Sequence, residues 1–190
     1  MMSLTGTDLR DADDDTLCTA AMIGDREAFD AIVNRYGPIL YRYSRRLLAS
    51  EADIADVVQD TFVAAWRQIG GFRRTSTLRT WLFAICYRKI ADTHRLKHAR
   101  PVEDWVLEPL ASSDTAADPF TAASNTEFLA ALESALAELP IRQRAVWMMR
   151  EIELLTFPEI GEVLSLSPDA ARGHHLRATK TLRVLLTRWQ

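Results

Sequence analysis

Two helix-start signals, eleven positions apart near the C-terminus, constrain the fold of this 190-residue chain more than any other feature. Thr156 is followed three residues later by Glu159, a pattern typical of a capping box in which each side chain bonds the other residue's backbone amide. Ser167 precedes Pro168, which suits the first position of a helix because proline lacks the N–H left unbonded there. The first helix therefore has room for only about two turns, ending at Leu164, and the second runs from Pro168 nearly to the C-terminus.

A two-turn helix, a turn of about three residues and a long basic helix are typical of a helix-turn-helix, whose second helix enters the major groove of DNA. One arc of this second helix should pack inward, and it holds Ala171, His175, Ala178, Leu182 and Leu185. A lone histidine on such an arc is more often a packing residue than a ligand. The opposite arc supplies candidate base and phosphate contacts, which are Asp169, Ala170, Arg172, Gly173, His174, Arg177 and Lys180.

The first hundred residues show helical periodicity in three stretches, at 16–48, 51–69 and 78–98. Glycine and proline predict breaks in the first stretch, near Gly24 and at Gly37–Pro38. The second stretch carries one apolar stripe that we interpret as core, made of Val58, Phe62, Ala65, Trp66 and Ile69.

The composition changes abruptly after the third stretch. Residues 101–125 contain three prolines and five acidic side chains but no basic one, which is typical of an extended linker. Helical periodicity resumes at 126–139 and 142–154. We therefore expect an all-α protein with two small helical domains, residues 1–100 and 126–190, joined by the acidic linker.

The net charge of -3 conceals a strongly uneven distribution. Residues 61–100 carry nine basic side chains and one acidic, and residues 141–190 carry eight and five. Residues 1–60 and 101–140 are acidic, with an excess of six and eight negative charges respectively. The two basic blocks can therefore face phosphate in two separate places, so the negative total does not exclude a nucleic-acid partner.

The usual residues of catalysis and metal binding do not form a recognisable site. Cys18 and Cys86 lie far apart and outside any CxxC pattern, and no carboxylate or cysteine completes a zinc site with His94 and His98. We expect no cofactor, no metal and no enzymatic activity. The N-terminus is acidic rather than a signal peptide, and no apolar run approaches membrane-spanning length, which predicts a cytoplasmic protein without membrane insertion.

A second candidate DNA surface lies in the first basic block. A polar loop with Phe72, Arg73 and Arg74 precedes a helix face that holds Trp81, Ala84, Arg88, Asp92 and Arg95. Aromatic and cationic side chains together can stack on the bases and neutralise the phosphates of single-stranded DNA. Tryptophan is just as often buried in a core, and this alternative stays open for Trp81.

Five motifs, in this order, resemble the extracytoplasmic-function group of the sigma-70 family: GDREAF at 24–29, DVVQDTF at 56–62, WLFAI at 81–85, LPIRQR at 139–144 and EIG at 159–161. The resemblance covers nearly the whole chain. It implies a factor that binds core RNA polymerase, directs it to promoter DNA and takes part in promoter melting and transcription initiation.

The resemblance also implies roles for particular residues. Asp56, Gln59 and Asp60 would dock on the clamp helices of the largest polymerase subunit, with the beta-subunit flap as a further contact, and the linker would thread the active cleft. A flipped, unpaired base of the minus-10 element would be captured by the loop from Phe72 to Thr77. The full minus-10 set is Phe72, Arg73, Arg74, Thr75, Ser76, Thr77, Trp81, Arg88, Asp92 and Arg95. The final helix would read the minus-35 element, and an anti-sigma protein would hold the factor inactive.

Three residues depart from the family pattern. Arg88 stands where the family commonly has asparagine, Ser165 where it has glycine, and His175 where it has an aliphatic residue. Because Arg88 differs from the family, the base preference at the minus-10 element does not follow from the resemblance. Ser165 predicts either a strained left-handed turn or a turn of another type. The competing interpretation is a helix-turn-helix regulator that binds its operator as a homodimer without polymerase.

Overall fold

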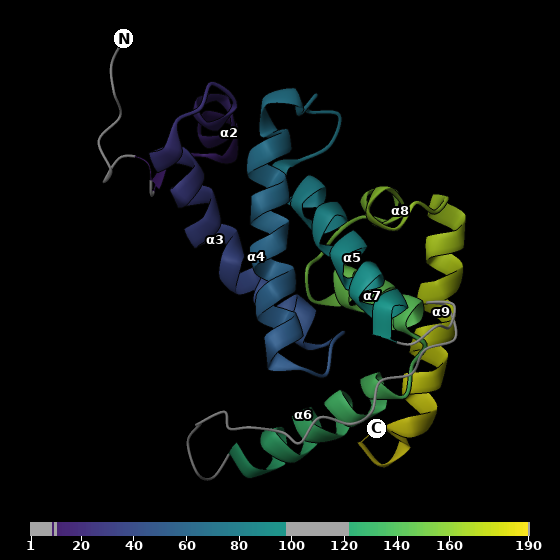
Figure 1. Ribbon diagram of the computed structural model, residues 1–190. Coiled ribbons are helices and arrows are strands. Elements are labelled where there is room, and N and C mark those ends of the chain that lie inside the picture. The colour runs from purple at the N-terminus through teal and green to yellow at the C-terminus, as the bar shows by residue number, and fades with distance from the viewer. Residues whose placement is uncertain (1–8, 10, 98–121, 190) are drawn as a thin grey trace.

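The computed structural model describes Leu9 and residues 11–97 and 122–189, and within these residues its regular structure is entirely helical (Figure 1). The N-terminal bundle consists of α2 (Asp14–Met22), α3 (Arg26–Arg45), α4 (Glu51–Gln68), η1 (Ile69–Gly71) and α5 (Leu78–Lys97). The C-terminal bundle consists of α6 (Ala122–Ala137), α7 (Ile141–Glu151), α8 (Phe157–Leu164), α9 (Pro168–Leu185) and η3 (Thr187–Trp189). The predicted all-α class is confirmed.

Side-chain caps begin most of these helices where the sequence predicts a start. The Asp25 carboxylate accepts from the Ala28 amide at 3.1 Å at the start of α3, directly after Gly24 with its left-handed φ of 93°. This confirms the predicted break near Gly24, because the aspartate carboxylate supplies a hydrogen-bond acceptor for an amide in the first turn, which has no acceptor within the helix.

The break predicted at Gly37–Pro38 is wrong, because α3 runs unbroken through Pro38. Proline removes only one backbone hydrogen bond, and here it lies on the exposed side of the helix. Tyr36 and Leu40, on either side of it, are buried in the core of the bundle. Burial of this apolar face holds the helix together across the proline.

Several residues predicted to be inside are partly exposed, and two of them, Trp66 and Leu185, keep more than a third of their surface accessible. Phe62, Ala65 and Ile69 of the α4 stripe are buried as predicted, but Trp66 keeps 37% of its surface exposed. Leu185, at the end of α9, is 39% exposed. In both cases the apolar stripe is wider than the surface that neighbouring helices cover, which periodicity alone does not reveal.

The C-terminal bundle begins earlier than predicted. Helix α6 starts at Ala122, so the end of the predicted linker 101–125 is helical, and the remainder of that linker lies outside the described residues. Helix α7 ends at Glu151 rather than Leu154. Leu154 has φ 57°, a left-handed conformation in which an α-helix cannot continue.

Arg144 joins three segments of the protein. Its side chain is fully buried and donates to the carbonyl oxygens of Leu136 at 2.5 Å, Ala137 at 2.5 Å and Leu139 at 3.0 Å, which caps the C-terminus of α6. It also donates to the Arg46 carbonyl at 3.2 Å, across to the N-terminal bundle. Burial lowers the pKa of this guanidinium to about 10, so it remains a cation at neutral pH.

The two bundles pack against each other along α5 and α8, which share one apolar core (Figure 1). At this contact the Arg79 guanidinium lies 2.5 Å from the buried Glu153 carboxylate, and the Thr80 hydroxyl donates to Glu159 at 3.2 Å. Two domains were predicted from the sequence, but this contact between them was not. Among the described residues, no helix is long and apolar enough to cross a bilayer.

Candidate functional site

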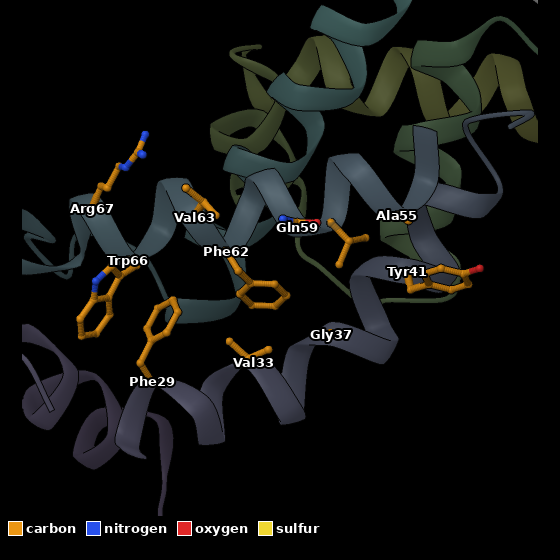
Figure 2. A pocket seen from close by; sticks show the side chains of 11 residues that line it. Phe29, Val33, Gly37, Tyr41, Ala55, Gln59, Phe62, Val63, Trp66 and Arg67 are labelled. Atoms are coloured by element: carbon orange, nitrogen blue, oxygen red, sulfur yellow. The ribbon is translucent and has the colours of Figure 1, made fainter. Parts of the chain in front are cut away.

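An apolar groove of about 690 Å³ runs between α3 and α4 (Figure 2). Its walls are Phe29, Val33, Gly37 and Tyr41 of α3 and Ala55, Val58, Gln59, Phe62, Val63, Trp66 and Arg67 of α4. The Trp66 ring meets the Phe29 ring edge-on, with centroids 4.9 Å apart, at one end of the groove. We call this feature the α3–α4 groove.

The residues predicted to contact polymerase lie on and beside this groove. Asp56, Gln59 and Asp60 are all exposed on α4, and Gln59 lines the groove itself. The Asp60 carboxylate lies 3.4 Å from the Lys89 amine of α5, so part of its charge is already balanced. The groove was not predicted from the sequence, because the whole α4 stripe, including Trp66, was assigned to the core. The width of that stripe is the signal that was available.

The predicted minus-10 loop has one buried end. Phe72 is buried and stacks on Trp81, with ring centroids 4.8 Å apart and planes 30° from parallel. Trp81 itself is half-buried, while Arg73 is exposed. Arg74 has a left-handed φ of 55°, and its guanidinium donates to the Thr19 hydroxyl at 2.5 Å. Phe72 therefore supports Trp81 from within, and Arg74 ties the loop to α2.

The other end of the loop caps α5. The Thr77 hydroxyl accepts from the Thr80 amide at 3.1 Å, and Thr75 and Ser76 lie between this cap and Arg74. Further along α5, the exposed Arg88 donates to the Ala84 carbonyl at 3.0 Å.

Asp92 and Arg95 continue the same face of α5. They pair with each other, so the net charge of that part of the face comes chiefly from Arg88.

The helix-turn-helix forms as the caps predict. The Thr156 amide donates to the Glu159 carboxylate at 2.7 Å and the Glu159 amide to the Thr156 hydroxyl at 3.4 Å, which completes the capping box of α8. The Ser167 hydroxyl accepts from the Ala170 amide at 3.1 Å and starts α9. Ala171, Ala178 and Leu182 are buried, so the inward face of α9 is fixed by packing.

The opposite face of α9 is largely open to solvent. Asp169, Arg172, Arg177 and Lys180 are exposed, whereas Ala170, Gly173 and His174 are half-buried. Asp169 pairs with Arg172, which reduces the positive charge at the start of the helix. The Arg177 guanidinium lies 3.4 Å from where a Cβ on Gly173 would stand, so this glycine gives the arginine room to fold back along the helix.

Leu176 also lies on the exposed side of α9, with 71% of its surface accessible. This residue is missing from the DNA contacts predicted on the opposite arc of the helix. Its position between Arg172 and Lys180, four residues from each, was the available signal.

His175 and His94 hold structural positions. His175 Nε2 lies 2.7 Å from the Glu151 carboxylate, and the imidazole meets the Phe157 ring edge-on, which joins α9 to α7 and α8. His94 is buried in α5, and His98 lies outside the described residues. Residues 11–97 and 122–189 contain no group of three potential metal ligands.

The turn between α8 and α9 is the strained left-handed turn, and not the turn of another type that Ser165 also allowed. Ser165 has φ 55° and ψ 47°, in the left-handed region that glycine ordinarily occupies. A Cβ on Gly161 would stand 2.6 Å from the Leu166 carbonyl oxygen, closer than real Cβ contacts allow. The turn can approach α8 this closely only because residue 161 has no side chain.

Comparison with known families places both bundles in one kind of protein. The model of Sigma-70 region 2 matches residues 32–100, and the model of Sigma-70, region 4 matches residues 129–182. The first match includes the α3–α4 groove apart from Phe29, together with the loop and α5. The second includes the helix-turn-helix.

Curated relatives match along most of the chain. RNA polymerase sigma factor CnrH of Cupriavidus metallidurans is 33% identical over 180 residues, which cover 91% of this chain and 94% of that protein. ECF RNA polymerase sigma factor SigM of Mycobacterium tuberculosis is 28% identical over 173 residues, covering 91% and 84%.

Two solved structures resemble the whole arrangement. CnrH in complex with the cytosolic domain of CnrY matches with a TM-score of 0.68 and 32% identity, over 92% of this chain and 97% of that chain. The sigma factor RpoE, in complex with the anti-sigma factor NepR from Bartonella quintana, matches with a TM-score of 0.67 over 84% and 96%. At 21% identity the second comparison supports the fold alone.

Proposed function

Because the chain belongs to the extracytoplasmic-function group of sigma-70 family RNA polymerase sigma factors, which bind core polymerase and direct it to promoters, we propose a specific division of labour among its surfaces. The α3–α4 groove receives core polymerase, α5 and its loop bind the opened minus-10 element, and α9 reads the minus-35 element. The observation that carries this proposal is the separation of one apolar groove from two cationic helix faces on a single chain. Such a factor has no catalytic step of its own and works in the cytoplasm, where polymerase acts.

Transcription reconstituted from purified components tests the proposal as a whole. Core polymerase with this protein should initiate at particular genomic promoters, and core polymerase alone should not. A regulator that binds an operator without polymerase would instead give specific binding to DNA by a homodimer and no new transcripts. That alternative is not favoured, because the relatives match both bundles rather than the helix-turn-helix alone.

The α3–α4 groove has the chemistry of a helix-binding site. Its lining is mostly apolar, and Asp56 and Asp60 place negative charge on the adjacent surface of α4. An amphipathic helix with an apolar stripe and basic flanks would bury the stripe in the groove and pair its cations with these carboxylates. We assign this role to the clamp helices of the largest polymerase subunit.

Val63→Arg should weaken the affinity for core polymerase at least tenfold, equivalent to about 1.4 kcal/mol or more. Val63 lines the groove with 40% of its surface exposed, so the larger side chain can be tolerated by the fold while a cation blocks an apolar contact. Competition with unmodified factor for core polymerase measures the affinity. Gln68→Arg is the matched control, since it adds the same charge to an exposed α4 position outside the groove; equal loss in both variants would contradict the assignment.

The minus-35 reader is the exposed face of α9. Capping by Ser167 and packing by Ala171 and Ala178 fix the helix, so its outward side chains are presented in a defined register. Arg177 and Lys180 supply cations for bases and phosphates, and Leu176 supplies an apolar group suited to a thymine methyl.

Arg177→Ala should weaken minus-35 binding by about 1 to 3 kcal/mol if Arg177 reads a base, and should then also relax specificity at one position. If it touches only phosphate, binding should fall uniformly across sequences, and the slope of log affinity against log salt should decrease by about one. Titration of holoenzyme onto promoter variants at several salt concentrations distinguishes these results. Arg188→Ala removes an equal charge from η3, away from this face; a loss no larger than in that control would exclude Arg177 from the site.

The resemblance to CnrH, solved with the cytosolic domain of CnrY, supports a protein inhibitor as a further partner. We propose that a cognate anti-sigma protein covers the α3–α4 groove and keeps polymerase away. Purification from the native host at normal expression should yield a small protein that co-elutes with the factor and is displaced by core polymerase. Recovery of free, transcriptionally active factor would contradict this proposal.

A further inference from the structure

An ion pair joins the helix that carries the predicted polymerase contacts to the helix that carries predicted minus-10 contacts. The Asp60 carboxylate of α4 lies 3.4 Å from the Lys89 amine of α5, and the two helices pack side by side (Figure 1). The Asp60 side chain is 63% exposed and the Lys89 side chain 34%. Because both charges lie at the surface, opening this pair requires little free energy.

Lys89 is not among the predicted DNA contacts, but it lies beside them. We call the side of α5 with Arg88, Asp92 and Arg95 the minus-10 face. Lys89 follows Arg88 directly, so its side chain leaves the helix about 100° further round, at the edge of this face that adjoins α4. A lysine ammonium is a point charge on a flexible aliphatic stem and pairs with carboxylates and phosphates alike. The same ammonium can therefore turn towards Asp60 or towards a DNA strand that lies along α5.

The charge balance of α5 shows what release of this lysine would change. Three of its described cations pair with carboxylates: Arg79 with Glu153, Lys89 with Asp60 and Arg95 with Asp92. Arg88, the remaining described cation, donates to the Ala84 carbonyl of its own helix. Among the described side chains of α5, a free Lys89 would therefore give the helix a second cation that no carboxylate balances, and each additional phosphate contact strengthens binding to DNA.

Asp60 has a second possible partner. It is one of the predicted contacts to core polymerase, and it lies one helical turn from Asp56 on the exposed side of α4. Two carboxylates four residues apart repel each other, which favours a cation beside them. A lysine or arginine of polymerase that pairs with Asp60 would compete with Lys89 for the carboxylate.

We propose that Lys89 is a further contact to a phosphate of the minus-10 strand, and that Asp60 holds it away from DNA until core polymerase occupies the carboxylate. Polymerase binding then releases a cation that the promoter uses, and promoter binding releases a carboxylate that polymerase uses. Each partner strengthens the binding of the other by the same factor, because coupling between two binding sites is reciprocal. This inference rests on the proposed function and deepens it by linking its polymerase surface to one of its DNA surfaces.

Binding of single-stranded DNA by the full-length factor without polymerase gives the first test. The probe is a fluorescent strand carrying the minus-10 element of a promoter identified by reconstituted transcription, and anisotropy at several salt concentrations measures the affinity. Asp60→Asn should strengthen binding about two- to fivefold, the range expected when one exposed ion pair no longer competes. The slope of log affinity against log salt should become steeper by about 0.7, the contribution of one phosphate on a single strand.

Two comparisons show whether Lys89 causes this gain. Lys89→Met keeps an aliphatic side chain of similar length without the charge, and in that background Asp60→Asn should change the affinity by less than about 1.5-fold. Asp30→Asn is the matched control, because it removes the same charge from an exposed position on α3. Its effect should also stay below about 1.5-fold, since solvent screens a distant exposed charge.

The holoenzyme gives the second test, with the same strand as probe. Polymerase occupies Asp60 there and leaves Lys89 to the phosphate. Lys89→Met should therefore lower the affinity of the holoenzyme about two- to fivefold and make the salt slope shallower by about 0.7.

Three outcomes would overturn the inference: the same gain from Asp60→Asn with and without Lys89, an equal gain from Asp30→Asn, or a holoenzyme whose affinity and salt slope do not respond to Lys89→Met. A factor that neither binds core polymerase nor initiates at any promoter would instead contradict the proposed function, so the two failures are distinguishable. Equal melting temperatures for the variants and the unmodified protein verify that the fold is intact.

Discussion

Replacing Arg144 by methionine should lower the free energy of unfolding of the C-terminal bundle by about 3 to 5 kcal/mol. Methionine fills much of the same space but cannot donate to the carbonyls of Leu136, Ala137 and Leu139, which then remain without their cationic donor inside the protein. Leaving a buried acceptor without a hydrogen-bond partner destabilises the fold by more than a typical exposed hydrogen bond stabilises it. Urea unfolding of the full chain, followed by circular dichroism and tryptophan fluorescence, measures the change.

Two further variants separate this cause from a general effect of losing an arginine. Arg144→Lys keeps the charge, but an ammonium cannot reproduce the planar arrangement of donors, so an intermediate loss is expected. Arg172→Met removes an exposed arginine from the same bundle and should change stability by no more than about 0.5 kcal/mol. A value for Arg144→Met within about 1 kcal/mol of the unmodified protein would contradict the capping role of this residue.

Helix starts could be predicted from the sequence because capping is local chemistry. The acceptors that bond the first amides of α8 and α9 lie within one turn of them, in Thr156 with Glu159 and in Ser167, and Pro168 fixes φ at the start of α9. Residues next to each other in the sequence therefore specify where these helices start. The Pro38 break could not be resolved in the same way. Whether a proline ends a helix depends on burial by α4 and α5, which are remote in sequence.

The candidate site was less predictable than the fold. Periodicity identified the apolar face of α4 but not how much of it other helices cover, so Trp66 was assigned to the core although it lines the α3–α4 groove. Charge led to Arg177 and Lys180, whereas the exposed Leu176 carried no such signal. The loop around Arg74 was predicted from its polar sequence, but its contact with Thr19 joins residues 55 positions apart and has no sequence pattern.

Contacts between the two bundles could not be predicted from the sequence either. Arg79 and Glu153 are 74 positions apart, and each alone is compatible with an ordinary exposed charge. Their pairing is possible because α5 and α8 lie side by side (Figure 1). Long-range packing of this kind decides which charged residues become buried, and a single sequence does not specify it.

The helix-turn-helix provides the second large effect, since Gly161→Ala should destabilise the C-terminal bundle by about 3 kcal/mol. The added methyl would stand 2.6 Å from the Leu166 carbonyl oxygen, which is backbone and can move only if the turn at Ser165 moves. Ser165 resists this because a non-glycine residue in the left-handed region has few alternative conformations nearby. Urea unfolding of the full chain measures the loss, and minus-35 binding should fall with it.

The family motif suggests why these two positions belong together. This chain has glycine at 161 where the resembled E-I-A motif has alanine, and serine at 165 where the family commonly has glycine. A glycine at 165 would let the turn move away from an alanine at 161, so the two substitutions should compensate each other.

A double-mutant cycle tests this compensation. Ser165→Gly alone should change stability by no more than about 1 kcal/mol, because relief of the left-handed strain offsets the flexibility that glycine adds to the unfolded chain. Combined with Gly161→Ala, it should recover at least about 1 kcal/mol of the loss relative to the sum of the single effects. Strict additivity would mean that the Cβ at 161 is accommodated by α8 rather than by the turn, and that Gly161 does not set the spacing between the two helices of the DNA reader.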